Sequence, residues 1–232
     1  MQTFATETIT LPLPPHGDRP VQLKSDSHFS GHLVFCRKCR DQPGVAPGQV
    51  LEVESHLEMN LALILAMRPK VADLECQVRF DWRRPEDEKL KRHFFDFRVI
   101  LVDGSRVAVM VKPSRKLRCP EFCALRDSVD AAMTPDFADR VIVLTERNIC
   151  PVELYNASLL DSLKESDPEA DAAAKRSMRG VQGGRPIGEI VKEIDMAGRG
   201  FRAVGRLLRQ GELSLTKLER ITLGAVVCRT AA

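Results

Sequence analysis

Two apolar segments joined by an Asp-Gly turn constrain the fold of this chain more than any other feature. The stretch His93–Pro113 carries Val-, Ile- and Phe-rich arms on either side of Asp103-Gly104-Ser105. Such arms favour β-strands, and Asp-Gly between them is a strong signal for a hairpin turn. The sequence therefore predicts a β-hairpin near the centre of the fold.

Two charged residues interrupt this apolar hairpin. Asp96 lies among three phenylalanines, and Lys112 ends the apolar run Val107–Val111. A charged group beside a core is costly unless it is paired or binds a metal. In one interpretation both residues mark strand ends and point to solvent. In the other, an acid and a lysine on adjacent strands converge on a metal and a phosphate, as in a nuclease site.

Length and composition bound the class of protein. The 232 residues suffice for one large domain or for a core domain with a small one, and 44% hydrophobic residues indicate a globular chain. No apolar run reaches the ~18 residues of a membrane span. The N-terminus lacks the pattern of a signal peptide, so the seven cysteines are expected to be reduced thiols in a cytoplasmic protein.

Charge is distributed unevenly along the chain. Residues 175–232 hold 12 Lys and Arg against 5 Asp and Glu, a net +7, which leaves 23 against 27, or −4, for residues 1–174. A basic C-terminal segment on an acidic body favours a surface that contacts nucleic acid. Around Phe201–Gln210 a group of arginines forms either such a contact or a solvated polar face: Arg199, Arg202, Arg206 and Arg209.

Helical periodicity places two more acids near the hairpin. Val50–Met67 is predicted to be a helix whose apolar stripe includes Leu57, Leu61 and Leu65. Glu58 falls at or within that stripe, and Glu54 lies one turn earlier. A buried carboxylate of this kind either reaches out at the edge of the stripe or has a function.

The order of the elements predicts a mixed α/β sheet flanked by helices. A strand at Val71–Trp82 precedes the hairpin, and a helix at Pro120–Met133 leads to a strand at Val141–Leu144. A strand–helix–strand crossover makes the last strand parallel to Val107–Val111.

Four regions follow from composition. Residues 1–45 are expected to be an N-terminal arm, 46–165 the α/β domain, 166–186 a linker because of Gly180 to Pro186, and 187–232 a small domain. In that domain, helices at 187–196 and 201–210 followed by two short strands fit a winged-helix-like unit.

One cysteine pair raises the question of zinc. Cys36 and Cys39 form a CxxC motif, and the nearest other pair, Cys119 and Cys123, lies far along the chain. Distant pairs do form zinc sites. The spacing nonetheless favours a surface turn with incidental cysteines.

The candidate site residues suit metal-dependent phosphodiester cleavage. The carboxylates of Glu58 and Asp96 can hold Mg²⁺, a hard cation that prefers oxygen. The metal would polarise the phosphodiester and lower the pKa of a bound water. Lys112 would orient that water or stabilise charge on the phosphate. Lys116, just beyond it in the basic segment Ser114–Arg118, would contact DNA.

The order of several short motifs resembles the TnsA family, the restriction-endonuclease-like subunits of heteromeric transposases in the PD-(D/E)xK superfamily. The motifs are Glu54–Glu58, Val71–Gln77, Phe95–Phe97, Val109–Pro113, Val143–Ile149 and Leu154–Ala157. The resemblance covers about residues 45–165, with a looser match beyond. It implies a nuclease-fold domain and a winged-helix-like C-terminal domain in a bacterial cytoplasmic protein.

The resemblance also implies an activity and partners. A TnsA-like subunit hydrolyses a phosphodiester at transposon ends with Mg²⁺ or Mn²⁺, while a TnsB-like partner transposase cuts the other strand. Its C-terminal domain binds that partner or an ATPase regulator. DNA contacts are then expected at Lys116, Arg199, Arg202 and Arg206.

Residue by residue, Glu58, Asp96 and Lys112 fall on the family's catalytic glutamate, aspartate and lysine. Met110 departs from the pattern, because that position should supply a Glu or Gln oxygen and a thioether is a poor ligand for Mg²⁺. Glu54, or the Val111 carbonyl with water, could replace it, which makes Glu58, Asp96 and Val111 the expected metal ligands. We expect weakened metal affinity, and Met110→Glu should raise activity if the site is only weakened.

Three hypotheses remain open. The first is a metal-dependent DNA endonuclease subunit of a mobile element. The second is a non-cleaving relative that binds DNA or a transposase as an assembly factor. The third is an α/β protein without a nucleic-acid role, which predicts no salt-dependent retention on DNA.

Overall fold

A computed structural model describes residues 11–21, 29–35, 48–83 and 89–230. The chain divides into two compact units, Met1–Met59 with Lys70–Glu146, and Asn60–Pro69 with Arg147–Ala232. Cys36 and Cys39, the CxxC pair for which zinc was considered, lie outside the described residues. None of the described helices combines the length and apolar character needed to cross a membrane.

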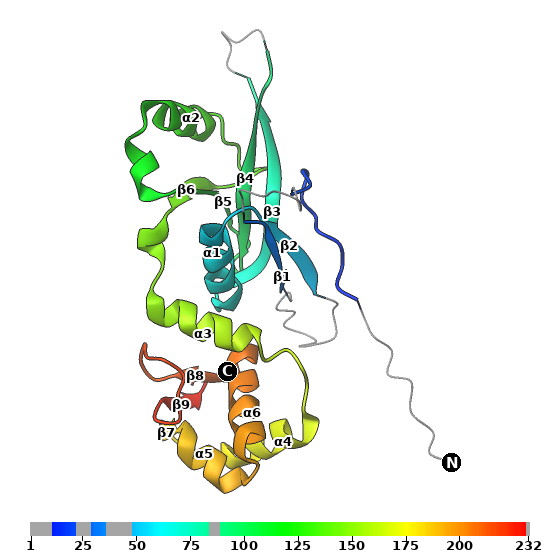
Figure 1. The fold of residues 1–232 in the computed structure, drawn as a ribbon, viewed down its shortest axis with the longest axis vertical. Coiled ribbons are helices and arrows are strands. Elements are labelled where there is room, and N and C mark those ends of the chain that lie inside the picture. Colours follow the sequence, from blue (N-terminus) through cyan, green and yellow to red (C-terminus); the bar gives the residue numbers. More distant parts are fainter. Residues whose placement is uncertain (1–10, 22–28, 36–47, 84–88, 231–232) are drawn as a thin grey trace, which may run out of the picture. The chain divides into compact units, whose positions relative to one another are not determined.

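A mixed four-stranded sheet forms the first unit (Figure 1). Its strands, in spatial and sequence order, are β3 (Val71–Trp82), β4 (Lys91–Leu101), β5 (Arg106–Val111) and β6 (Arg140–Leu144). The first three are antiparallel, and β6 is parallel to β5. The predicted hairpin, the crossover and the mixed α/β class are therefore confirmed.

The β4–β5 turn explains why the hairpin signal is reliable. Gly104 has a φ of 87°, a left-handed conformation that glycine adopts without steric cost. The Asp103 carboxylate accepts hydrogen bonds from the Ser105 amide at 2.9 Å and from its hydroxyl at 2.6 Å. The Asp-Gly-Ser sequence thus supplies both the backbone freedom and the side-chain acceptor of the turn.

Helix α2 (Pro120–Ala131) packs on the sheet. Phe80, Phe95 and Met110 from the strands form a buried cluster with Phe122 and Val129 of α2. At its edge the Trp82 indole donates to the Ser128 hydroxyl at 3.1 Å. The short 3₁₀ helices η1 (Ser114–Arg118) and η2 (Glu146–Asn148) flank this region.

The predicted helix at Val50–Met67 is in fact a strand followed by a shorter helix. β2 (Gln49–Val53) pairs antiparallel with β1 (Gly31–Phe35), and α1 (His56–Met67) begins after a turn. Residues 49–53 alternate between buried and half-buried, which is strand rather than helix periodicity. The prediction of an arm over residues 1–45 also fails where the structure describes it, because β1 is part of a sheet.

The second unit combines helices with a small antiparallel sheet. Its further elements are α3 (Pro151–Asp161), α4 (Pro168–Ser177), β7 (Arg185–Pro186), α5 (Ile187–Ile194), α6 (Ala197–Gln210), β8 (Leu213–Leu215) and β9 (Val226–Arg229). The strand order is β7-β9-β8. The two predicted helices and two predicted strands of this region are present.

The predicted linker at residues 166–186 is wrong over much of its length, because it contains α4. Ala170, Ala174 and Met178 are buried in one cluster with Ile187 and Leu207. The Asp167 side chain caps α4 by accepting from the Ala170 amide at 3.2 Å. Only the glycine-rich part from Gly180 to Gly184 forms a break, and the small alanines that mimic a linker instead allow close packing.

Candidate active site

Glu58 occupies the first turn of α1 and is buried, with 7% of the residue exposed. Its carboxylate accepts from the Glu54 amide and from the Ser55 hydroxyl, each at 2.8 Å, while the Ser55 hydroxyl accepts from the Glu58 amide at 3.1 Å. This resembles a capping box, in which a serine and a glutamate satisfy the start of a helix. Glu58 therefore has a structural role as well as a place in the predicted site.

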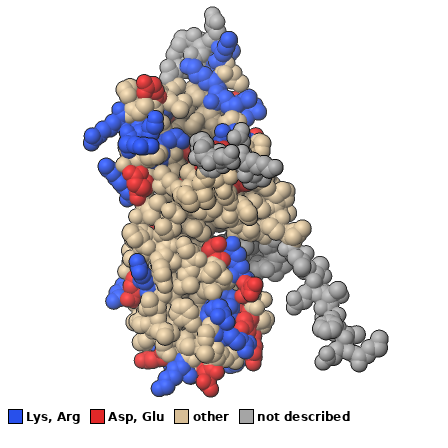
Figure 2. Space-filling model, in the orientation of Figure 1, with Lys and Arg blue, Asp and Glu red and all other residues tan. Residues whose placement is uncertain are grey.

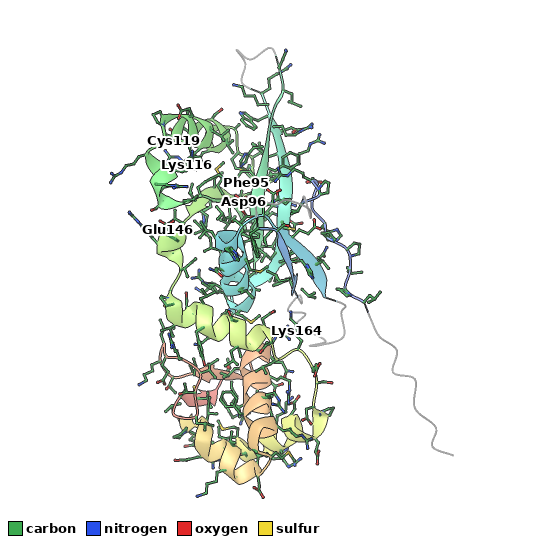
Figure 3. The ribbon with its side chains drawn as sticks, in the orientation of Figure 1. Phe95, Asp96, Lys116, Cys119, Glu146 and Lys164 are labelled. Carbon is green, nitrogen blue, oxygen red and sulfur yellow. The ribbon has the colours of Figure 1, made fainter. Side chains whose placement is uncertain are left out.

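Asp96 lies on β4 beside Phe95 (Figure 3) and is also buried. The β4–β5 ladder ends at the pair Phe97 and Val109, and the Asp96 carboxylate accepts from the Val111 amide at 2.6 Å just beyond it. Burial raises the pKa of Asp96, partly offset by the positive charge of Lys112 and by the Val111 amide.

Lys112 follows β5 and approaches Asp96, with 3.8 Å between its Nζ and Asp96 Oδ2. The lysine side chain is 35% exposed, whereas that of Asp96 is 10% exposed. The lysine thus bridges a buried carboxylate and solvent. The predicted convergence of the acid of one strand and the lysine of the next is what the structure shows.

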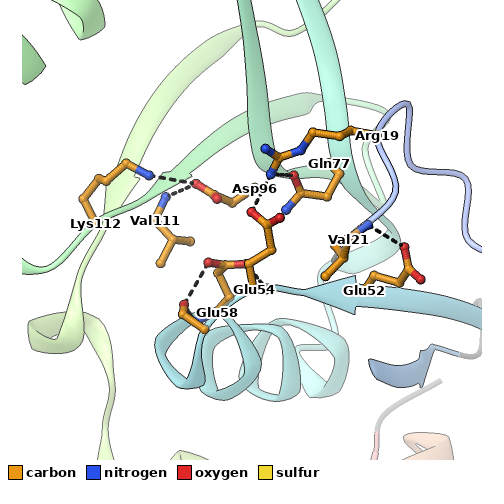
Figure 4. A network of polar contacts seen from close by, with 10 residues as sticks. Arg19, Val21, Glu52, Glu54, Glu58, Gln77, Asp96, Val111 and Lys112 are labelled. Carbon is orange, nitrogen blue, oxygen red and sulfur yellow. Dashed lines mark hydrogen bonds and ion pairs between the residues drawn. The ribbon is translucent and has the colours of Figure 1, made fainter. Parts of the chain in front are cut away.

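Glu58 and Asp96 are close enough to affect each other. Burial raises the pKa of Glu58, and repulsion from the Asp96 charge raises it further. Glu54 adds to the repulsion felt by Asp96. Figure 4 shows these three carboxylates, here called the carboxylate cluster, facing a common region between the start of α1 and the strands β4 and β5.

Sequence reasoning missed two residues of this site, Arg19 and Gln77. Arg19 pairs with the Glu54 carboxylate and donates to Gln77 Oε1 at 2.7 Å (Figure 4). Gln77 is almost fully buried and has a φ of 50°, which is unusual for a residue other than glycine. A glutamine inside an apolar strand is a visible signal, but nothing near Arg19 in sequence marks that residue.

Met110, at the position where the family pattern has a ligand oxygen, and Val111, an expected metal ligand, both have structural contacts. Met110 is fully buried in the cluster with Phe80, Phe95 and Phe122. The Val111 amide serves Asp96, which gives Val111 a positioning role. Met110 therefore serves as a core residue.

The donor set fits a hard cation bound by few protein ligands. Among the described residues, no three His, Cys, Asp or Glu side chains form a group that could hold a metal ion. Mg²⁺ is, however, commonly held by one or two carboxylates, with water and substrate phosphate completing its shell. Glu58 and Asp96 supply such a pair, and a cation would relieve their mutual repulsion.

Cys119 and Cys123, the second pair considered for zinc, both have hydrogen-bond partners within the first unit. Cys119 donates to the Glu121 carboxylate at 2.8 Å, and Cys123 donates to the Leu117 carbonyl at 3.2 Å. Both thiols are free.

The predicted DNA-binding residues divide into two groups. Lys116 lies on η1 (Figure 3). It is exposed, as are Arg115 and Arg118 of the same short helix. Figure 2 shows Lys and Arg side chains gathered over this part of the first unit. Arg202 is also exposed, on α6. These positions can reach a phosphate backbone.

Arg206 does not lie on the predicted open surface, and Arg199 is exposed but paired with acids. Arg206 is buried and paired with Asp171 of α4 at 2.7 Å. Arg199 pairs with Asp167 and Glu169 of the same helix, at 2.8 and 2.6 Å. The excess of positive charge on α6 is therefore largely neutralised by the acidic start of α4, which lies just outside the segment counted as basic.

Comparison with known proteins adds no family. No protein-family model matches the chain, and no curated protein matches it significantly.

Proposed function

We propose that this protein is a TnsA-like, metal-dependent DNA endonuclease subunit of a heteromeric transposase, which hydrolyses a phosphodiester at transposon ends. One observation carries the proposal. Glu58 from α1, Asp96 from β4 and Lys112 after β5 lie together where the β4–β5 ladder ends, with the pKa of both acids raised. Groups with shifted pKa that share one place in a fold are typical of functional sites.

The architecture of both units supports this proposal. Three antiparallel strands followed by a helix and a parallel strand are compatible with a restriction-endonuclease-like sheet. In the second unit, α4, β7, α5, α6, β8 and β9 follow in the order expected of a winged-helix-like domain. Such an order supports a domain that binds DNA or a protein, but the function rests on the site.

The chain's own residues account for positioning and charge in the proposed reaction. Glu58 and Asp96 would hold Mg²⁺ or Mn²⁺, which when bound supplies Lewis-acid activation of the phosphodiester and of water. Asp96 is oriented by the Val111 amide, so its carboxylate is held in one direction. The Lys112 ammonium, partly open to solvent, stabilises negative charge that develops on the phosphate.

DNA would approach over the basic surface that continues from Lys112. Arg115, Lys116 and Arg118 lie on the segment directly after it, and all three are exposed. Lysine and arginine contacts to phosphates supply most of the non-specific affinity for DNA. The proposed partners are therefore DNA, a TnsB-like transposase and an ATPase regulator, with the second unit as the protein-binding part.

A second candidate is a non-cleaving TnsA relative that acts as an assembly factor. Two observations favour it: Met110 offers a buried thioether in place of a ligand oxygen, and Arg19 already neutralises Glu54. In this case the DNA-binding surface would be retained without hydrolysis. The two candidates differ in whether a divalent cation binds at Asp96.

Calorimetric titration with Mn²⁺, alone and with DNA, tests the proposal. The variants are Asp96→Asn and the control Asp81→Asn, which changes a carboxylate of β3 paired with Arg79 and Arg92. We expect binding to the wild type and to the control, and its loss in Asp96→Asn. Binding that survives in Asp96→Asn would contradict the proposed site. No binding to the wild type with DNA present would favour the assembly factor.

A further inference from the structure

Residues 11–21, here called the strap, run along β2 and β3 in the first unit. The Leu13 amide donates to the Gly48 carbonyl at 2.7 Å, and the Val50 amide donates to the Leu13 carbonyl at 2.9 Å. Further on, the Asp18 amide donates to the Gln77 carbonyl at 3.1 Å, and the Asp18 carboxylate accepts from the Arg79 amide at 2.8 Å. The strap is therefore fixed at both ends by main-chain contacts.

Close to the second of these anchors, the strap brings a cation to the carboxylate cluster. The Arg19 guanidinium pairs with Glu54 and donates to Gln77 (Figure 4). It also lies over the Phe94 ring, 5.3 Å from its centroid. Its side chain is 41% exposed. A charge in this position remains open to competition from ions in solution.

One donor of the strap and one of β3 are unsatisfied where the two segments meet. Arg19 Nε and Gln77 Nε2 are buried without a hydrogen-bond partner in the described chain. A buried donor without a partner is destabilising. The backbone of Gln77 is also in the left-handed conformation, and backbone strain of this kind is common at functional sites.

The charges of the site complete the argument. Three carboxylates, Glu54, Glu58 and Asp96, meet two cationic side chains, Arg19 and Lys112. Lys112 approaches Asp96 and Arg19 binds Glu54, whereas Glu58 has only hydrogen bonds to a main-chain amide and a hydroxyl among the described residues. A divalent cation held by Glu58 and Asp96 would meet repulsion from the Arg19 charge, which lies on the neighbouring Glu54.

We propose that Arg19 is a tethered cation whose charge opposes the binding of a divalent metal ion by Glu58 and Asp96, so that the strap controls how tightly the site binds metal. This inference rests on the proposed metal site and deepens it. Coupling between two ligands of one site is reciprocal, so metal binding must in turn weaken the hold of the strap. Release of the strap by DNA or a partner would then raise metal affinity at the time of assembly.

The effect of Arg19 is measured by titrating the wild type and two variants with Mn²⁺ and comparing their affinities. Arg19→Gln removes the charge and keeps a hydrogen-bonding side chain, whereas Arg92→Gln removes an exposed arginine paired with Asp81 elsewhere on the sheet. We expect Arg19→Gln to bind Mn²⁺ about tenfold more tightly than the wild type, because a nearby like charge has an effect of this order. Arg92→Gln should bind like the wild type.

A second variant tests the effect of the strap on metal binding without changing any charge. A Cβ at Gly17 would lie 3.3 Å from the Gln77 Cβ and from two main-chain carbonyl oxygens, so Gly17→Val should push the strap away from β3. It should bind Mn²⁺ more tightly although Arg19 is present. Hydrogen exchange supplies a readout apart from affinity: Mn²⁺ should speed exchange of the Asp18 and Leu13 amides in the wild type.

The outcomes separate this inference from the proposed function. If the wild type and both strap variants bind Mn²⁺ equally, the proposed effect of Arg19 on metal affinity is wrong, but the proposed metal site is retained. Weaker binding by Arg19→Gln would also overturn it and make Arg19 a positioning residue. If none of the proteins binds Mn²⁺, with or without DNA, both the proposed metal site and this inference are wrong.

Discussion

The Asp96 carboxylate accepts a hydrogen bond from the Val111 amide at 2.6 Å, just beyond the end of the β4–β5 hydrogen-bond ladder. This bond gives a candidate catalytic acid a structural task. A buried amide without an acceptor costs about 1–3 kcal/mol. Substitutions of Asp96 can therefore separate two effects: loss of metal binding, and loss of stability from the missing hydrogen bond between strands.

Asp96→Asn and Asp96→Ala should differ in stability but not in metal binding. Asparagine keeps an acceptor for the Val111 amide and removes a buried charge, so its free energy of unfolding should match or exceed that of the wild type. Alanine leaves the amide unpaired and should lower it by about 2 kcal/mol. Urea unfolding measures both, and equal stability of the two variants would show that the bond contributes little.

His93 should make stability depend on pH. Burial, with the charges of Lys112 and Arg19, lowers the pKa of His93 from 6.5 to about 4. Between these values the unfolded chain binds more protons at His93 than the folded chain, so stability falls as the pH drops through this window. The largest loss from this group is about 3 kcal/mol.

Denaturant unfolding between pH 7 and pH 4 checks this dependence. His93→Phe, which keeps an aromatic ring against Phe95, should lose less stability than the wild type over that range. Lys112→Met should also reduce the loss, because one of the repelling charges is removed. If the stability of His93→Phe falls with pH as steeply as that of the wild type, His93 is not the source of the dependence.

Met110→Glu should destabilise the protein instead of restoring a metal ligand. The side chain is fully buried among Phe80, Phe95 and Phe122, where a carboxylate would have no partner. We expect a loss of about 3 kcal/mol or more, whereas Met110→Leu should cost less than about 1.5 kcal/mol. A stable Met110→Glu variant with tighter Mn²⁺ binding would show that this position can turn toward the site.

The two groups of basic residues should respond differently to mutation. Replacing Arg115 and Lys116 with alanine should weaken DNA binding and lower the salt slope by about 1 for each phosphate that is no longer neutralised. Arg206→Ala should mainly destabilise the protein, by about 3 kcal/mol, because Asp171 would be left unpaired. Fluorescence anisotropy at several salt concentrations, beside thermal unfolding, distinguishes these effects. An unchanged slope in the double variant would exclude η1 as a DNA contact.

Local signals explain which parts could be predicted from the sequence. The hairpin, the crossover strand and the meeting of Asp96 with Lys112 all follow from alternation, turn residues and strand adjacency. Arg19 could not be predicted, because its pairing with Glu54 spans distant sequence and no motif marks it. The role of α4 was hidden because its alanines and acids resemble a linker, and only their partners Leu207 and Arg206 show their burial.

The way in which the chain divides has a consequence for its inheritance. Residues Asn60–Pro69 belong with the second unit although the chain before and after them belongs with the first. A single crossover between genes therefore cannot exchange one unit and leave the other whole. A hybrid that joins two such chains between Glu146 and Arg147 would take Asn60–Pro69 from one parent and the rest of the second unit from the other.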